Sequence, residues 1–299
     1  MYHLEKKFNL GLNLDADISE LDKFFSQNRD LISSVYFSLP LGAAYYSRTK
    51  LREEYAENQD QLLNALNIIR ANGIKLEVTF NTELNAAELE QGIEYILKNS
   101  IDPEEIVCMN SSVQVLKKAF PKAKLISSFC NGYDNVEDGF HAIVLGQQYL
   151  RDESKRREWV DKGYEVILLL NNGCSFECMH KKCNSRVCSA LYENSRKQYD
   201  EEEIYAIQSF FPTELKVLLE RDRASDNYIF KISNRPLGLE YTKKVLDAYS
   251  TLAQYTETDF DNNPKKYALF GALTELCRRI DKYHYPRIME IKRSLMKDM

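Results

Sequence analysis

Four of the seven cysteines lie in one short segment, and they are the residues of this sequence with the most evident chemistry. Cysteines this close together form disulfides or bind metal. Their spacing lacks the C-x2-C pairs typical of structural zinc sites, whereas gaps of three to four residues suit ligands spread over an iron–sulfur cluster. The spacing C-x3-C-x4-C-x4-C therefore favours an iron–sulfur cluster of the [4Fe–4S] type, with zinc or free redox-active thiols as alternatives. The four ligands would be Cys174, Cys178, Cys183 and Cys188.

Composition and net charge indicate the class of protein and the cellular compartment to which these cysteines belong. The chain has 299 residues, 44% of them hydrophobic and 28% charged, as in soluble globular proteins. A net charge of -5 gives no general attraction to DNA or to an anionic membrane. No apolar run approaches the roughly 20 residues that span a bilayer. We therefore expect a cytoplasmic protein with no DNA and no membrane as partner, in a reducing compartment where clustered cysteines bind metal.

Short apolar segments alternate about eight times with amphipathic helical segments such as 18–31 and 86–98. Eight strand–helix units predict an α/β protein with a (β/α)8 TIM-type barrel. A doubly wound open sheet is the alternative, because periodicity does not show whether a sheet closes. The predicted strands are 8–13, 35–38, 75–80, 105–109, 125–129, 142–145, 165–170 and 228–232.

Two segments depart from this alternation. Residues 171–227, between strands seven and eight, form a long Cys-rich insertion, and loops of that length are usually functional. Residues 256–299 predict a C-terminal helical appendage on a barrel that spans 1–255. Inside one helix, the charged run Lys155-Arg156-Arg157-Glu158 predicts a solvent-facing surface.

Polar residues follow several of the predicted strands. Active sites of such barrels lie at the C-terminal ends of the strands, so these residues predict an amide-rich site with two cations. Lys231 and Arg235 would hold an anionic group of the substrate, and a structural ion pair at the barrel rim is the alternative for both. The sequence identifies no catalytic residue. The predicted substrate-binding residues are Arg48, Asn81, Asn110, Asn172, Lys231 and Arg235.

Several short motifs together resemble one family. They are Val144-Leu145 with Arg151-Asp152, Asn172-Gly173-Cys174 after the seventh strand, and Phe230-Lys231-Ile232-Ser233-Asn234-Arg235. This pattern resembles the collagenase-like peptidase family (peptidase class U, number thirty-two), whose last motif reads Lys-Ile-Glu-Gly-Arg. The resemblance covers about residues 6 to 250. The Glu-Gly of that motif is Ser233-Asn234 here, the usual His-Gly before the first cysteine is Asn172-Gly173, and a cysteine expected before the last strand is absent.

The resemblance implies a (β/α)8 barrel and, as in several members, a four-cysteine [4Fe–4S] cluster. Those members carry out oxygen-independent hydroxylation of the ubiquinone ring or of RNA bases, and other members are described as proteases. We therefore expect an iron–sulfur barrel enzyme that hydroxylates, or otherwise modifies by redox chemistry, a small-molecule, peptide or RNA substrate. The alternatives are a non-catalytic metal-binding partner subunit of a modification complex and a peptidase. The chain has no G-x-S-x-G or H-E-x-x-H motif to support proteolysis.

Overall fold

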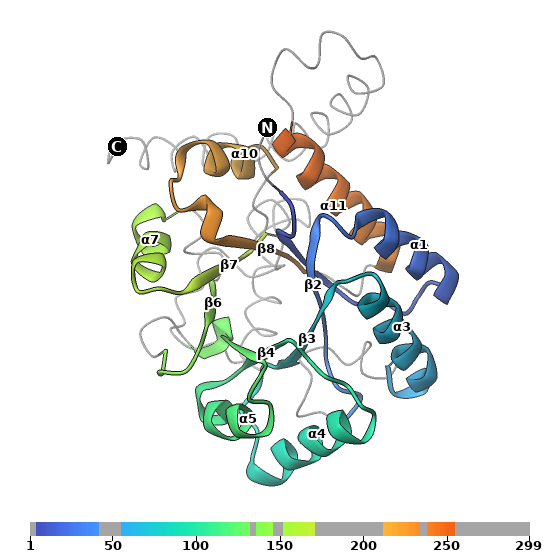
Figure 1. Cartoon of the computed structure of the whole chain (residues 1–299). Helices are drawn as coiled ribbons and strands as arrows, with labels where there is room; N and C mark the ends of the chain where they lie inside the picture. Colours follow the sequence, from blue (N-terminus) through green and yellow to red (C-terminus); the bar gives the residue numbers. More distant parts are fainter. Residues whose placement is uncertain are drawn as a thin grey trace, which may run out of the picture.

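Eight parallel strands close into a barrel in the computed structural model (Figure 1). The structure describes residues 4–41, 55–131, 136–145, 152–170, 212–233 and 238–254. The first strand pairs with both the second and the eighth, which closes the sheet and confirms the barrel over the open sheet. The strands are β1 Phe8–Gly11, β2 Ile32–Phe37, β3 Lys75–Phe80, β4 Glu105–Cys108, β5 Lys124–Ser127, β6 Ala142–Leu145, β7 Glu165–Leu169 and β8 Tyr228–Ile232.

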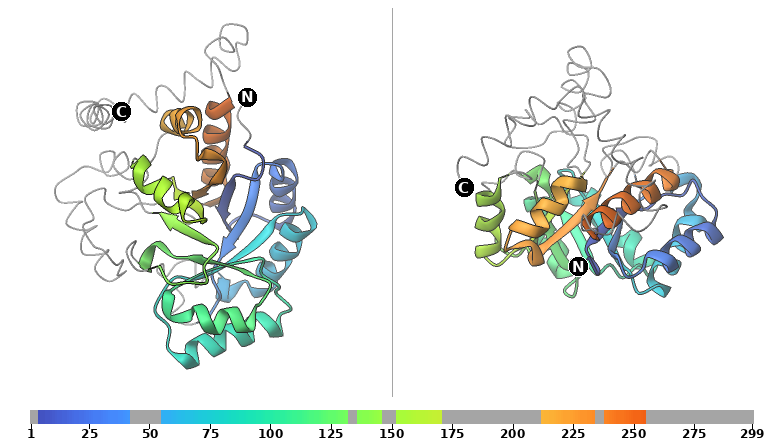
Figure 2. Two further views of the ribbon diagram at one scale, coloured as in Figure 1. Left: turned by 60° about the vertical axis from the view of Figure 1, so that its left-hand side comes forward. Right: turned by 90° about the horizontal axis from the view of Figure 1, so that it is seen from above.

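The helices lie on the outside of the barrel, as both views of Figure 2 show. None of the helices in the described ranges is long and apolar enough to cross a membrane. The predicted appendage, 256–299, and most of the Cys-rich insertion lie outside the described residues, although α10 and η4 fall within 171–227. The helices are α1 Ile18–Asn28, α3 Gln59–Ala71, α4 Ala86–Lys98, α5 Val113–Ala119, α7 Glu153–Asp161, α10 Pro212–Arg221 and α11 Gly238–Gln254, with 3-10 turns η2 Asn110–Ser112, η3 Phe129–Asn131 and η4 Ser225–Asn227.

One face of each strand packs against the helices, and the other points into the barrel. In a strand successive side chains alternate between faces, and residues in register on neighbouring strands share a face. Thr79, Val107 and Ile126 are in register and therefore point the same way. The interior of β4 to β8 is a separate apolar cluster. It consists of Val107, Ile126, Ala142, Val144, Ile167, Leu169 and Ile229.

The opposite half of the interior is polar, and this explains where β2 begins. The strand starts at Ile32, three residues before the predicted start. The predicted strand was shorter because the polar pair Ser33 and Ser34 was not expected inside a strand. Both serines are nevertheless buried. Ser34 is in register with Asn9 of β1 and Lys75 of β3, so a serine suits the face that it occupies.

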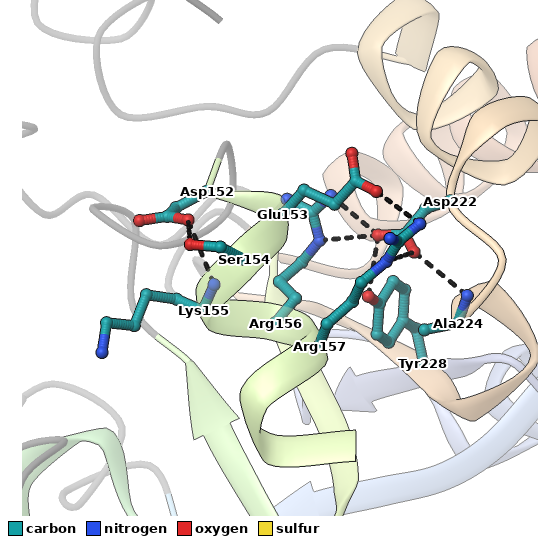
Figure 3. Close-up of polar contacts among 9 residues, drawn as sticks. All are labelled: Asp152, Glu153, Ser154, Lys155, Arg156, Arg157, Asp222, Ala224 and Tyr228. Carbon is teal, nitrogen blue, oxygen red and sulfur yellow. Dashed lines mark hydrogen bonds and ion pairs between the residues drawn. The ribbon is translucent and has the colours of Figure 1, made fainter. Parts of the chain in front are cut away.

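A buried ion pair joins α7 to the segment after α10 (Figure 3). Arg156 Nη2 and Nε donate to Asp222 Oδ2 at 2.8 and 3.2 Å, and the Tyr228 hydroxyl donates to the same oxygen at 2.8 Å. The backbone N–H of Ala224 donates to Asp222 Oδ1 at 3.0 Å. Arg156 is only 5% exposed, so the expectation that its charged run faces solvent is wrong for this residue. The pattern of charges along one helix does not show that a carboxylate from a distant segment pairs with one of them.

The hydrogen-bond partners of Asp222 set the direction in which the pKa of its carboxyl group is shifted. Burial alone would raise the pKa of this carboxyl, but the hydrogen bonds from Arg156, Tyr228 and the Ala224 N–H outweigh burial and lower it. Burial and the neighbouring Asp222 raise the pKa of the Tyr228 hydroxyl, so it stays protonated and keeps donating. Tyr228 begins β8, at the end of the barrel opposite the expected active site, so we assign this cluster to stability.

A second link connects the end of β1 to α11. The Leu239 N–H lies 3.1 Å from each oxygen of the Asp15 carboxylate, which therefore caps the helix. Asn13 Nδ2 donates to Thr242 Oγ1 at 3.1 Å on the same helix. Gly238 has a φ of +85°, and a Cβ there would lie 2.3 Å from Asp15 Oδ2. Glycine is needed at this position both for its backbone angle and for the close approach of Asp15.

The variant Asp222→Asn should lower the free energy of unfolding by about 3–5 kcal/mol, because it leaves the Arg156 cation buried without a counter-charge. Urea denaturation followed by circular dichroism measures this. The matched control is Asp161→Asn on the exposed end of α7, which should change stability by less than about 0.5 kcal/mol. Since the pKa of Asp222 is lowered by folding, its contribution is present at neutral pH and is lost as pH falls through that pKa. Equal stability of the two variants would contradict this assignment.

The variant Gly238→Ala should be destabilised more than Gly163→Ala. Both glycines have positive φ, +85° and +87°, so both substitutions introduce backbone strain of about 1–3 kcal/mol. A Cβ at Gly163 meets nothing within 4 Å, whereas one at Gly238 collides with the Asp15 carboxylate. The difference between the two melting temperatures isolates the cap of α11. Identical shifts would show that the cap contributes no stability.

Candidate functional site

Glu77 lies inside the barrel and is fully buried. It sits on β3, where residues 76, 78 and 80 pack outward into the main core, so residues 75, 77 and 79 point inward. Its Oε2 accepts hydrogen bonds from Asn9 Nδ2 at 2.9 Å and from Ser34 Oγ at 3.2 Å. Its Oε1 forms an ion pair with Lys231 Nζ. Three strands thus converge on one carboxylate.

Lys231 reaches this carboxylate from β8 and has a side chain that is 8% exposed. Its ammonium also lies over the ring of Tyr36, 4.0 Å from the centroid, a favourable cation–π contact. The Tyr36 hydroxyl donates to the Ile232 carbonyl at 2.8 Å and fixes the ring. The structural ion pair left open by the sequence is therefore present at Lys231. A substrate anion would have to share this lysine with Glu77.

Polar groups also lie at the C-terminal ends of β2 and β3. The hydroxyls of Ser38 and Thr79 are 2.8 Å apart, and Thr79 donates to the Phe37 carbonyl at 3.1 Å. Asn81 follows β3 directly, and its buried Oδ1 has no hydrogen-bond partner within the described ranges. An amide oxygen in this state can accept a hydrogen bond from a ligand.

Asn110 and Asn131 connect the ends of β4 and β5. Asn131 Nδ2 donates to the Cys108 carbonyl and to Ser127 Oγ at 3.1 and 3.0 Å. Asn131 Oδ1 accepts from the Asn110 N–H at 2.9 Å. This network holds two strand ends in place, and it puts Asn110 at the same end of the barrel as Asn81 and Lys231.

The predicted metal ligands Cys174, Cys178, Cys183 and Cys188 lie outside the described residues, as do Arg48, Asn172 and Arg235. The described chain stops at Leu170, four residues before the first of these cysteines. The preceding residue, Leu169, is in register with Lys231 on the neighbouring strand. The chain therefore enters the Cys-rich segment beside the strand that carries the buried lysine.

The described part of the chain contains no group of three His, Cys, Asp or Glu side chains that could hold a metal. Its two cysteines are Cys108 and Cys130, and neither is part of a disulfide. Burial raises the pKa of Cys108 to about 12, so this thiol stays protonated. Cys108 is therefore neither a nucleophile nor a ready metal ligand.

The N-terminus of α11 is the place where many barrels bind phosphate, after strands seven and eight. Here the Asp15 carboxylate already accepts the Leu239 N–H at this helix end. A phosphate group would meet a negative charge, so the geometry does not favour a phosphate ester in this position.

Sequence reasoning missed Glu77, Asn9 and Tyr36 as members of the site. One signal could have found Glu77: it is the single acid in the strand Leu76-Glu77-Val78-Thr79-Phe80, where it must face a buried interior. Asn9 and Tyr36 carry no such signal, because an asparagine or a tyrosine in a strand is common.

Comparisons with known proteins concern the fold alone. No protein-family model matches the chain, and no curated protein matches it. Solved structures with similar coordinates include a U32 peptidase (9% identity, TM-score 0.46, covering 77% of this chain and 93% of that one). Another is orotidine 5'-monophosphate decarboxylase from Methanocaldococcus jannaschii (13%, 0.41, 84% and 100%). A protein assigned as a mandelate racemase from Mesorhizobium loti is matched over 55% of this chain and 44% of its own, less than half its length (13%, 0.36). Enzymes of unrelated chemistry share this barrel, and these likenesses do not distinguish among them.

Proposed function

We propose that this chain is a barrel enzyme that binds an iron–sulfur cluster through Cys174, Cys178, Cys183 and Cys188 and modifies its substrate by redox chemistry, such as oxygen-independent hydroxylation. The observation that supports the proposal is the register of Leu169 with Lys231, because the Cys-rich segment follows β7 directly. A cluster in that segment and a substrate at Lys231 would share the C-terminal end of the barrel, where barrel enzymes react. Cytoplasmic location and membership of the collagenase-like peptidase family belong to the same proposal.

The polar and the apolar half of the barrel interior would each bind a different part of the substrate. Lys231 would pair with an anionic group of the substrate, and Asn81 Oδ1 would accept a hydrogen bond from it. The apolar half, which includes Val144, Ile167 and Leu169, would cover the carbon skeleton and keep water out. The cluster, when bound, would supply electron transfer.

The depth of Lys231 limits the size of what can reach it. Its side chain is 8% exposed and its partner Glu77 is fully buried. Only a small molecule, or a single group that protrudes from a peptide or an RNA, can make this contact. We therefore favour a small-molecule substrate over a polymer that lies across the surface.

Protein purified without oxygen should contain about four iron and four sulfide atoms per chain and absorb visible light. Iron, sulfide and zinc analysis measures this. Serine at any one of Cys174, Cys178, Cys183 or Cys188 should lower the iron content, since the cluster loses a thiolate ligand. The matched control is Cys130→Ser, a half-buried thiol of the described barrel, which should keep all the iron.

Two results would contradict the proposal. Stoichiometric zinc without a visible absorption band would indicate a structural metal site, and the chain would then fit a metal-binding partner subunit. Absence of any metal from anaerobically prepared protein would remove the redox centre altogether.

A further inference from the structure

Two large apolar side chains are exposed among the described residues, Leu97 at 61% and Val115 at 47%. Leu97 lies in the last turn of α4, and Val115 lies on α5. These helices connect β3 to β4 and β4 to β5, so they are neighbours on the outside of the barrel (Figure 1 and Figure 2). The exposed apolar residues therefore lie on one side of the molecule.

Val115 lies on the side of α5 that faces α4 and solvent. The buried residues Val113 and Leu116 mark the inner face of α5. Lys117 points toward the connection between β5 and β6, because a Cβ at Gly139 would lie 3.8 Å from its Nζ. Successive residues of an α-helix are about 100° apart around its axis. Val115, two positions before Lys117, therefore points away from that connection.

Leu97 lies on the side of α4 that faces α5. The helices of the barrel all return in the same direction and with the same hand between parallel strands, so equivalent positions on successive helices face equivalent neighbours. Lys117 directly follows the buried Leu116 and faces the next unit of the chain. Leu97 likewise directly follows the buried Ile96, so it faces α5. Both exposed apolar side chains thus border the line between the two helices.

Opposite charges accompany these apolar residues on the two helices. On α4, Glu90 and Glu94 are exposed and four positions apart, so they lie on one side of the helix. On α5, the exposed Lys118 comes three positions after Val115, and the exposed Lys122 follows the end of the helix. Within the described ranges these four charged side chains form no ion pair.

Helix α7 shows how a helix can neutralise its own charges, since Lys155 and Lys162 both contact Glu158. On α4, Lys98 stands four positions after Glu94, a spacing that permits such a pair. In the part of the chain that the structure describes, these two side chains nevertheless form none. The acids of α4 and the lysines of α5 therefore remain available to a partner.

We propose that the outer surface of α4 and α5 is the contact surface of a homodimer. In a two-fold dimer the same surface meets itself, so a charged contact surface must carry both signs. An axis that runs along the helices places α4 of one copy against α5 of the other, and unlike charges then meet. This α4–α5 face consists of Glu90, Glu94, Leu97, Val115, Lys118 and Lys122.

The arrangement of charges selects both the axis and the partner. An axis across the helices would place α4 against α4, with acids opposite acids, and the lysines of the two α5 helices together. RNA or an anionic membrane would be repelled by Glu90 and Glu94. A second copy, by contrast, presents lysines to these acids and an apolar side chain to Leu97 and Val115. Apolar residues bordered by charged ones are typical of protein interfaces.

Sedimentation velocity of the full chain tests the proposal, with the protein prepared without oxygen and with a reductant that excludes disulfide-linked copies. The average mass should rise with protein concentration from that of one chain to that of two. Glu94→Lys and Lys118→Glu should each raise the dissociation constant about tenfold, because the symmetry repeats each altered contact twice. Leu97→Ala should also weaken the dimer, without any change of charge.

A mixture of the two charge variants gives the sharpest result. In a mixed dimer the introduced lysine of one chain meets the introduced glutamate of the other, and the second contact is native. Equal amounts of Glu94→Lys and Lys118→Glu should therefore associate as the wild type does. The matched control is Lys23→Glu, which makes the same charge change at an exposed lysine of α1 and should leave association unchanged. Circular dichroism and melting temperatures establish that each variant is folded.

Several results would overturn the proposal. One is a chain that sediments as a single copy at every concentration. Another is a dimer that neither charge variant weakens, or that the mixture does not restore, since its contacts would lie elsewhere. A monomer that binds polyuridylate, and loses that binding in Lys118→Glu, would assign the face to RNA instead. The iron and sulfide measurements do not depend on any of these results, so the proposed function is tested separately.

Discussion

The arrangement of this barrel depends on one buried ion pair, between Glu77 and Lys231. Burying two charges is costly, and removing one partner of such a pair costs about 3–5 kcal/mol because the other is left uncompensated. The neighbours of the pair therefore have to supply every remaining hydrogen bond. Asn9 and Ser34 do so from β1 and β2, and the ring of Tyr36 covers the ammonium. Polar side chains from four adjacent strands, β8, β1, β2 and β3, thereby meet inside the closed barrel.

The same principle recurs at the end of α11. Two positions at this end of the barrel could attract an anion, the ammonium of Lys231 and the N-terminus of α11. Each already holds a carboxylate of the chain itself, Glu77 and Asp15 respectively. A barrel built in this way does not collect anions indiscriminately.

Much of the fold follows from local pattern. β3, β6 and β8 have the bounds that alternation predicted, because each is a short run rich in apolar residues. β2 began earlier than expected, since Ser33 and Ser34 look like a turn until their strand neighbours are known. Arg156 looked solvent-exposed for a related reason: its partner Asp222 is distant in the sequence. A local pattern indicates which secondary structure a segment prefers, but it does not indicate which distant residues the segment contacts in the fold.

The sequence by itself determined the strand–helix alternation, the end of the barrel at which polar residues gather, and the spacing of four cysteines after β7. These depend on propensity, periodicity and chain order, which are local properties. Only the tertiary structure decided that the sheet closes and that Lys231 is paired with Glu77. Both are contacts between residues far apart in the chain, 154 positions for this pair. Closure brings β8 beside β1, and only then can a lysine near the end of the barrel sequence reach a glutamate on the third strand.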